Sequence, residues 1–415
     1  MRCLFRWLLN GTHIYNLDTI GVQFGNKHQV CLEHQELEGS LNMNAEKNRI
    51  RGKAWSILLC GAVLLSVAGC AAEDTDTRQV VEKSGRKITV LDNKSEPVYT
   101  ELKLKDIRKV EGVRGTDFAS EDVMVVTREN RSLKAQVIEG QERYPLNLYL
   151  HTLSTGEETP LREGELNYGA PQMSPDKTHV FFKELYDVTG FGYIMDLAGN
   201  AAVKVSDAEF RIEEGKWADN GHVIFPDMEG NIISADVSGK QETLLKTGIP
   251  YVHEVVQTGS RILYVTGEDS QLSAYDTVTK ETKVLRKNVV WAVPSPDGSR
   301  LAIVERTGRG EMTLKLCDSE GNEQSSVASG QQVFGTSWSP DGQLLAYAVT
   351  AAGSADDQQD LFITRMETGE QTPVLNDIRV ADQLHWSPSG KKLLATATVL
   401  KDNVYQFLTY VVSLS

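Results

Sequence analysis

Cysteine is scarce in this chain of 415 residues, which contains five. Four of them lie at or before Cys70, and Cys317 stands alone in the rest of the sequence. A disulfide framework needs an even set of cysteines, and a zinc site needs closely spaced ones such as Cys-x-x-Cys, so the pattern excludes both. Cys317 falls in a predicted strand, where a free cysteine usually serves as a small buried side chain.

Positive charge is scarce as well. The formal net charge is -14 at pH 7, and the segment from Cys70 onward holds 36 Lys and Arg against 52 Asp and Glu. Such a surface repels phosphate backbones, which excludes nucleic acid as a partner. It also disfavours direct adsorption of the folded domain onto anionic lipid.

Catalytic signatures are missing from the sequence. It has no Gly-x-Ser-x-Gly nucleophile motif, no His-Glu-x-x-His and no phosphate-binding loop. The histidines that follow Cys70 are widely scattered, and each is expected to be a strand or turn residue. We therefore expect a protein that is not an enzyme, with no metal site and no cofactor.

Long hydrophobic runs are missing too. The apolar run from Ala54 to Ser66 is shorter than the roughly 20 residues that a membrane helix needs. It follows a basic stretch that ends at Lys53, and it precedes Val67-Ala68-Gly69-Cys70, an arrangement typical of a secretory signal. The last four residues resemble the lipobox of bacterial lipoproteins. This resemblance implies that Cys70 carries diacylglycerol, with acyl chains such as palmitate, and becomes the mature N-terminus.

These features predict four segments. Residues 1–42 are an upstream extension that is absent from the mature protein, because Met43 begins the signal. Residues 43–69 are the lipoprotein signal peptide, residues 70–85 are a polar, flexible tether, and residues 86–415 are the folded domain. The location that follows is outside the bacterial cytoplasmic membrane, with the protein attached to a membrane through the lipid on Cys70.

One short motif recurs through the folded domain. Trp338-Ser339-Pro340-Asp341-Gly342 combines the residues that favour successive positions of a tight turn, and a strand-like run follows it. The equivalent positions in successive copies are Asp122, Lys177, Gly221, Gly259, Gly298, Gly342 and Gly390. They are 55, 44, 38, 39, 44 and 48 residues apart. A spacing near 40 residues with about four strands per repeat is typical of a β-propeller.

A second motif recurs after each copy of the first. After each turn an alternating strand ends in an Asp or Gly turn, as at Asp196, Asp236, Asp276 and Asp318. Each of these aspartates is expected to begin a turn in its own blade rather than to bind a metal. The charged stretch from Arg128 to Pro145 is expected to project from the ring.

The repeats resemble the TolB-like, or WD40-like PD40, β-propeller family from about residue 106 to the end. The resemblance implies an all-β fold with seven blades, with six or eight as alternatives. A strand from the N-terminal side is expected to complete the last blade, and the segment from Val98 to Leu104 is preferred for this closure. TolB has an additional α/β domain for which this sequence has no room.

The family resemblance also places the strand before each turn nearest the central channel. Six side chains near the channel mouth are therefore candidate binding residues: Tyr168, Glu214, His253, Trp291, Phe334 and Asp382. Aromatic rings beside polar groups in a concavity are typical of a ligand or peptide pocket. The alternative interpretation is that the same side chains fill the hub of the ring.

The sequence favours a non-catalytic binding or scaffold protein of the cell envelope. Its expected partner is an envelope protein, a peptide or a glycan. Two other interpretations stay open, namely a propeller enzyme that acts on glycan or peptide through channel carboxylates, and a sensor subunit of a membrane kinase or transporter.

Overall fold

The computed structural model describes residues 79–83, 86–90 and 102–415, apart from 139–140, 199–200, 268, 353–357 and 402–403. The regular structure in these residues is all β-strand. The predicted signal peptide and Cys70 lie outside the described residues, as does the upstream extension. In the described segments, no helix has the length and apolar character needed to cross a membrane.

A two-stranded hairpin precedes the propeller. Its strands β1 (Gln79–Lys83) and β2 (Arg86–Val90) pair in antiparallel fashion. β1 falls within the segment predicted to be a flexible tether. The hairpin belongs to the unit Asn16–Thr100, whereas the blades belong to the unit that includes Glu101–Ser415.

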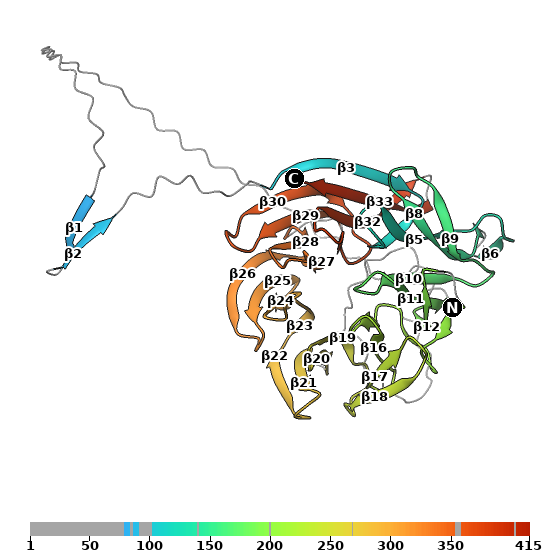
Figure 1. Ribbon diagram of the computed structural model, residues 1–415, viewed down its shortest axis with the longest axis horizontal. Coiled ribbons are helices and arrows are strands. Elements are labelled where there is room, and N and C mark those ends of the chain that lie inside the picture. The colour runs from blue at the N-terminus through green and yellow to red at the C-terminus, as the bar shows by residue number, and fades with distance from the viewer. Residues whose placement is uncertain are drawn as a thin grey trace, which may run out of the picture. The chain divides into compact units, whose positions relative to one another are not determined.

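Seven antiparallel sheets are arranged around a common centre, which confirms the predicted seven-bladed propeller (Figure 1). Blade 1 consists of β4 (Arg114–Phe118), β5 (Val123–Glu129), β8 (Leu146–Thr152) and β9 (Glu158–Arg162). Blade 2 consists of β10 (Tyr168–Met173), β11 (His179–Tyr186), β12 (Thr189–Asp196), β13 (Val203–Lys204) and β14 (Phe210–Arg211). Blade 3 consists of β15 (Lys216–Trp217), β16 (His222–Pro226), β17 (Asn231–Asp236) and β18 (Gln241–Lys246).

The remaining blades continue the same order around the ring. Blade 4 consists of β19 (His253–Thr258), β20 (Arg261–Thr266), β21 (Gln271–Asp276) and β22 (Thr282–Arg286). Blade 5 consists of β23 (Val289–Pro294), β24 (Arg300–Gly308), β25 (Glu311–Asp318) and β26 (Glu323–Gly330). Blade 6 consists of β27 (Gln332–Trp338), β28 (Leu344–Thr350), β29 (Gln359–Arg365) and β30 (Gln371–Ile378). Blade 7 consists of β31 (His385–Trp386), β32 (Lys392–Lys401), β33 (Val404–Leu414) and β3 (Leu104–Glu111).

The turn between the first two strands of a blade is stabilised by a buried serine. In three blades its hydroxyl donates to the aspartate two residues later at 2.6 Å. The same oxygen accepts a backbone N–H five residues ahead at 2.9–3.0 Å. These serines are Ser174, Ser295 and Ser339. The fourth turn residue has the predicted positive φ, which is 69° at Gly298, 68° at Gly342 and 70° at Gly390.

The tryptophan before the turn connects neighbouring blades. In three places its indole N–H donates to a backbone carbonyl on the innermost strand of the preceding blade. The pairs are Trp217 with Gln172 (3.1 Å), Trp338 with Val293 (3.0 Å) and Trp386 with Ser337 (3.2 Å). The contact recurs because each residue has the same place in its repeat. The aromatic residue therefore sets the position of one blade against the next in addition to packing in the core.

The ring closes between the two ends of the domain. β3 pairs with β33, with Leu104 opposite Leu414 and Glu111 opposite Leu408, so an N-terminal strand completes blade 7 as predicted. The preferred segment, Val98 to Leu104, was wrong in position, because the pairing strand begins where that segment ends. β4 begins at Arg114, so the closing strand must lie directly before it, and Val110 packs with Val113 in the same hydrophobic cluster.

Three of the four aspartates in the second motif have the turn role that was expected of them. Asp236, Asp276 and Asp318 each accept backbone N–H groups within their own turns. Cys317 is fully buried in a cluster formed by blades 4 and 5, which confirms the prediction of a structural thiol. Burial raises the pKa of this thiol to about 11, so the sulfur stays protonated near neutral pH.

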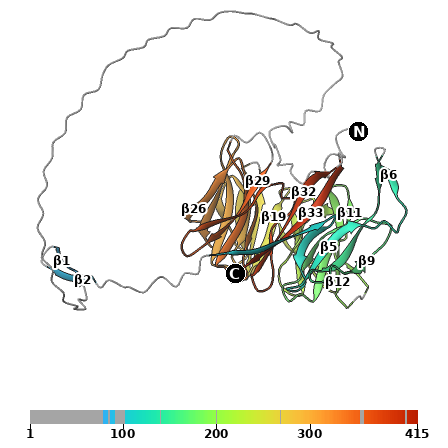
Figure 2. The same ribbon diagram turned by 90° about the horizontal axis from the view of Figure 1, so that it is seen from above.

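The two faces of the ring carry different connections. In an antiparallel blade, the first-to-second and third-to-fourth connections lie on one face, which we call the turn face. The second-to-third connections and the crossings to the next blade lie on the other, which we call the loop face. The predicted charged insertion of blade 1 belongs to the loop face. It contains the hairpin of β6 (Gln136–Ile138) and β7 (Gln141–Arg143), which stands out from the ring (Figure 2).

Replacing Gly342 by valine tests the geometry of the turn. A β-branched residue resists a φ of 68°, so the free energy of unfolding should fall by about 1–2 kcal/mol. The effect is a backbone effect, because an added Cβ would have its nearest neighbours at 3.6 Å. Gly342→Asn is the matched control and should cost less, since asparagine tolerates this conformation. Equal urea midpoints for all three proteins would contradict the turn geometry.

Candidate functional site

The first strand of each blade lies nearest the centre of the ring (Figure 1). In five blades its pairing with the second strand is interrupted by an irregularity of register. The backbone has positive φ at three of these places, namely Ala170, Glu254 and Gly335. Such bulges bend a strand and redirect its side chains.

Equivalent residues of the seven blades are found by counting back from the first residue of each turn. Four residues before the turn stand Gly115, Ala170, Glu214, Glu254, Trp291, Gly335 and Gln383. Five residues before it stand Arg114, Gly169, Glu213, His253, Val290, Phe334 and Asp382. Five of the six predicted candidates occupy these two positions, and Tyr168 precedes them by one residue.

Glu214 is a buried carboxylate that joins blade 3 to blade 4. It is 3% exposed and accepts the backbone N–H groups of Glu254 at 3.0 Å and Val255 at 3.4 Å. Lys216 lies 3.2 Å from Glu254. Burial, together with the negative charge of Glu254, raises the pKa of Glu214 to about 7. His253 is adjacent in sequence to Glu254, and burial lowers the pKa of its imidazole.

Lys183 on β11 adds a buried ammonium group to this region. Its side chain is fully buried, and its Nζ has no hydrogen-bond partner within the described part of the chain. The Nζ lies 5.0 Å and 5.6 Å from the ring centroids of Phe181 and Phe210. Burial lowers the pKa of Lys183 to about 8, although Glu214 and Glu213 counteract this shift.

Lys183 is unusual among the equivalent residues of the other blades. The corresponding position, four residues after the start of the second strand, holds Thr127, Pro226, Val265, Val304, Ala348 and Thr396. A charged side chain at this buried position is thus specific to blade 2. Lys183, Glu214, Lys216, His253 and Glu254 together form a group that we call the blade 2–4 cluster.

Trp291 and Phe334 form an aromatic pair on the inner strands of blades 5 and 6. Their ring centroids are 5.6 Å apart with an interplanar angle of 81°. The Nε1 of Trp291 and the Oγ1 of Thr336 are both buried, and neither has a hydrogen-bond partner among the residues that the structure describes. Each atom therefore retains the capacity for one further polar contact.

Asp382 joins the last blade to the first. Its carboxylate receives three hydrogen bonds from the Arg114 guanidinium at 2.6, 2.9 and 3.2 Å. Nearby, Asp117 accepts the backbone N–H groups of Phe118 at 2.6 Å and Met173 at 2.9 Å. Asp382 thus helps to close the ring between blades 7 and 1, whereas Asp117 joins blade 1 to blade 2.

Tyr168 is placed differently from the other candidates. It is 4% exposed and packs edge-to-face with Phe182 at 5.8 Å, within a hydrophobic cluster of blades 1 and 2. The guanidinium of Arg162 lies 5.2 Å from its ring centroid. The ring is thus part of the core, because it precedes the bulge that redirects the following residues.

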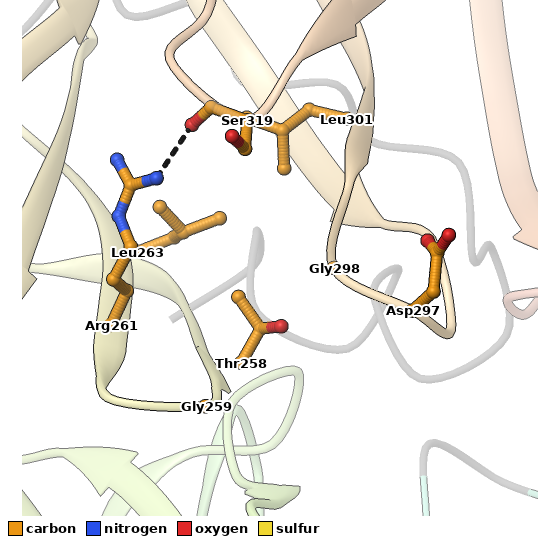
Figure 3. A pocket seen from close by; sticks show the side chains of 8 residues that line it. All are labelled: Thr258, Gly259, Arg261, Leu263, Asp297, Gly298, Leu301 and Ser319. Atoms are coloured by element: carbon orange, nitrogen blue, oxygen red, sulfur yellow. Dashed lines mark hydrogen bonds between the residues drawn. The ribbon is translucent and has the colours of Figure 1, made fainter.

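The described residues contain no group of three or more His, Cys, Asp or Glu side chains placed to hold a metal ion. They do line a half-open pocket of about 290 Å³ on the turn face, between blades 4 and 5. Arg261 and Asp297 lie on opposite sides of it, and Arg261 donates to the Ser319 carbonyl at 2.8 Å (Figure 3).

The pocket has a simple origin in the sequence. The prolines Pro296 and Pro340 each lie beside the turn glycine of the following blade, which is Gly342 or Gly390. Blade 4 lacks the proline, because its turn closes directly between Thr258 and Arg261. The space beside the next turn is left unfilled, and the Arg261 and Asp297 side chains already have hydrogen-bond partners, so the pocket is a consequence of packing.

Comparison with known proteins gives one partial sequence match. No family model matches the chain. A stretch of 93 residues, 22% of this chain, is 28% identical to the uncharacterized peptidase YuxL of Bacillus subtilis (strain 168). The match spans 14% of that protein's length, so its activity is not transferred here.

Solved structures give wider coverage. Oligogalacturonate lyase in complex with manganese is 17% identical, with a TM-score of 0.51 over 74% of this chain and 98% of that chain. The chain shares its β-propeller fold with this lyase. TolB from Acinetobacter baumannii is 14% identical, with a TM-score of 0.42 over 70% of this chain and 64% of that chain. At these identities the likeness concerns the fold and carries no residue role.

Three charged residues described above were not identified as candidates from the sequence, two on the inner strands and one on the second strand of blade 2. Arg114 and Glu254 occupy the same rungs as the predicted candidates. The degenerate turn of blade 1 hides the count for Arg114, and in blade 4 the neighbouring His253 was predicted instead of Glu254. Lys183 had a weak signal, since it is a charged residue that directly follows the apolar run Val180-Phe181-Phe182. Whether any of these side chains binds a ligand stays a prediction.

Replacing Lys183 by methionine tests the cost of the buried ammonium. The pKa is about 8 in the folded protein against 10.5 for a free lysine, so the charged form disfavours folding below pH 8. Lys183→Met should therefore raise the free energy of unfolding by up to about 3 kcal/mol at pH 7. The gain should fade between pH 8 and 10.5, as the native lysine loses its proton before the unfolded one does.

Lys216→Met is the matched control, because Lys216 is paired with Glu254. Its removal leaves a carboxylate without its partner and should lower stability at pH 7. Urea denaturation at several pH values measures both variants. If Lys183→Met destabilises the protein as Lys216→Met does, Lys183 has a favourable partner in the folded protein and its burial carries no net cost.

Proposed function

We propose that this protein is a bacterial lipoprotein that displays its propeller outside the cytoplasmic membrane as a non-catalytic binding module. The lipid is carried on Cys70, which ends the motif Val67-Ala68-Gly69-Cys70 after a basic and then an apolar segment. The propeller begins more than 30 residues later, with β3 at Leu104. The residues between Cys70 and Leu104 would therefore connect the lipid anchor to the propeller.

The observation that supports binding most directly is the half-buried aromatic ring of Trp291, together with buried polar atoms that have no hydrogen-bond partner. Trp291 is half-buried on an innermost strand and contacts Phe334. A ring plug would be expected to satisfy its buried polar atoms, because an unmade hydrogen bond costs about 1–3 kcal/mol. The Trp291 Nε1 and the Thr336 Oγ1 have no such partner in the described residues. The half-buried ring of Trp291 beside Phe334 is an aromatic surface of the kind that a peptide or glycan site uses.

The titratable residues of the inner strands support binding rather than catalysis. Arg114 pairs with Asp382, Lys216 pairs with Glu254, and Glu214 accepts two backbone N–H groups. Side chains held in this way connect blades. A catalytic set would require groups aimed together at one substrate position.

An enzyme acting on glycan or peptide is the second candidate. The observation in its favour is the blade 2–4 cluster, in which the pKa of Glu214 is about 7 and that of Lys183 is about 8. Groups that titrate near neutral pH are often found in active sites. Hydrolysis or elimination of a defined oligosaccharide or peptide, lost on Glu214→Gln, would favour this candidate.

Changing Cys70 to serine tests the anchor. Lipid transfer requires the cysteine thiol, so Cys70→Ser should release the protein from membranes or leave its signal uncleaved. Membrane fractionation with intact-mass analysis of the mature protein measures both outcomes. A variant that is processed and fractionates like the wild type would refute the lipoprotein proposal.

Changing Trp291 to alanine tests the binding site. If the aromatic pair anchors a ligand, Trp291→Ala should weaken partner capture by about 2 kcal/mol, or roughly thirtyfold, without loss of the fold. Capture is measured by crosslinked pull-down from native membranes, and folding is measured by thermal melting. Trp291→Phe retains the ring but lacks the N–H, so it separates the aromatic contact from the hydrogen bond. An unfolded Trp291→Ala protein would favour the hub-filling interpretation.

A further inference from the structure

The loop face is rich in exposed apolar side chains over blades 1 to 4. Apart from Val137 of the β6–β7 hairpin, which is 74% exposed, six large hydrophobic residues in its connections are between 36% and 64% exposed. They are Leu166, Tyr186, Val188, Met228, Ile249 and Tyr251. On the turn face, Val278 is the one exposed large hydrophobic residue among those that the structure describes. Exposed apolar groups confined to one side of a protein mark an interaction surface.

The loops that carry these residues contact one another. Leu185, next to Tyr186, donates its N–H to the carbonyl of Asn167 at 2.8 Å. Ile212 donates to the carbonyl of Val188 at 3.1 Å. Between the loops of blade 3, the hydroxyl of Thr247 donates to the Gly230 carbonyl at 2.8 Å. In each of these three pairs, a hydrogen bond joins one loop to its neighbour, and the pairs follow one another from blade 1 to the crossing into blade 4.

Tyr251 is the most exposed of the six and has an unusual backbone. It is 64% exposed with a φ of 62°, a conformation that is uncommon for a residue other than glycine. The surrounding loop therefore fixes the backbone while leaving the ring in solvent. A conformation of this kind is more often found at functional sites than elsewhere. Tyr251 also lies three residues before Glu254 of the blade 2–4 cluster.

The same loops carry an excess of negative charge. Six of their carboxylate side chains are exposed, namely Glu163, Glu165, Asp187, Asp207, Glu213 and Glu229. In the connections 163–167, 187–188, 205–215, 227–230 and 247–252 the one basic residue is Arg211, which lies 3.6 Å from Glu213. The blade 1 insertion on the same face adds Arg131, Lys134 and Arg143, and the crossing to blade 5 adds Lys287, which pairs with Asp269. A surface that mixes apolar and acidic residues complements a partner that mixes apolar and basic residues.

We infer that the loop face of blades 1 to 4 binds a basic, apolar segment of a partner protein, with Tyr251 as a central contact. This inference rests on the proposed function and specifies the class of partner. The exposed hydrophobic side chains would pack against apolar residues of the segment, and the surrounding carboxylates would face its Lys and Arg residues. An anionic lipid surface fits poorly, since the same carboxylates repel it.

A photoreactive benzophenone side chain in place of Tyr251 tests the inference on the full chain in native membranes. The matched control is the same side chain in place of Val278, which is 77% exposed on the turn face. The expected result is a protein crosslink at position 251 that exceeds that at position 278, with the crosslinked segment carrying net positive charge and apolar residues. Equal crosslinking at the two positions would overturn the inference, as would crosslinking to lipid or to a segment without net positive charge.

Charge reversal provides the second measurement. The triple variant Glu165→Lys, Asp187→Lys and Glu229→Lys should reduce the crosslink at position 251 by about fivefold or more. The control reverses Glu242, Glu281 and Glu370, which are exposed near third-to-fourth-strand turns, and should leave the crosslink unchanged. Both variants should melt like the wild type. Equal yields from the two triple variants would overturn the charge complementarity.

The outcome also separates this inference from the proposed function. If position 251 gives no crosslink while Trp291-dependent capture persists, the protein is a binding module whose site lies elsewhere. If neither probe captures a partner, both proposals fail.

Discussion

The hydrogen bond between serine and aspartate in the turn of each well-formed blade fixes the geometry on which the ring depends. In blades 2, 5 and 6 it joins the two residues at 2.6 Å, while the buried serine oxygen also receives a strand N–H. This arrangement holds the first two strands in register. Where a tryptophan precedes the turn, as at Trp338, its N–H then reaches the preceding blade. Blade 4 has a shorter turn, and a pocket forms beside it.

Most of the fold could be predicted from the sequence because the turn chemistry is local and is repeated. The positive φ of Gly298 and the seven blades follow from residues that are close in sequence. Closure by an N-terminal strand follows from the strand count, because the last repeat supplies three strands and a blade needs a fourth. The position of the closing strand was wrong, since it depends on how β3 leads into β4. Contacts such as Arg114 with Asp382 join residues 268 positions apart, so they follow from ring closure and not from any motif.

The candidate site illustrates the same limit. Counting from the turns located Glu214, His253, Trp291, Phe334 and Asp382 on two adjacent rungs of the ring. The burial of Tyr168 and the lowered pKa of Lys183 depend on side chains from neighbouring strands, which the count along the sequence does not reveal. Turn residues recur from blade to blade, whereas the inner-rung residues differ in size and charge. The inner strands of the repeated blades therefore differ around the ring, with the blade 2–4 cluster, the aromatic pair on blades 5 and 6, and the Arg114–Asp382 pair between blades 7 and 1.

The most direct test of a binding propeller is hydrogen exchange of its backbone amides, compared between native membranes and the purified protein. A partner on the loop face should slow exchange in the segments 185–188 and 247–252, while the turns at Gly298 and Gly342 exchange at the same rate in both preparations. Protection of the turn face instead, or identical exchange throughout the chain, would contradict the account.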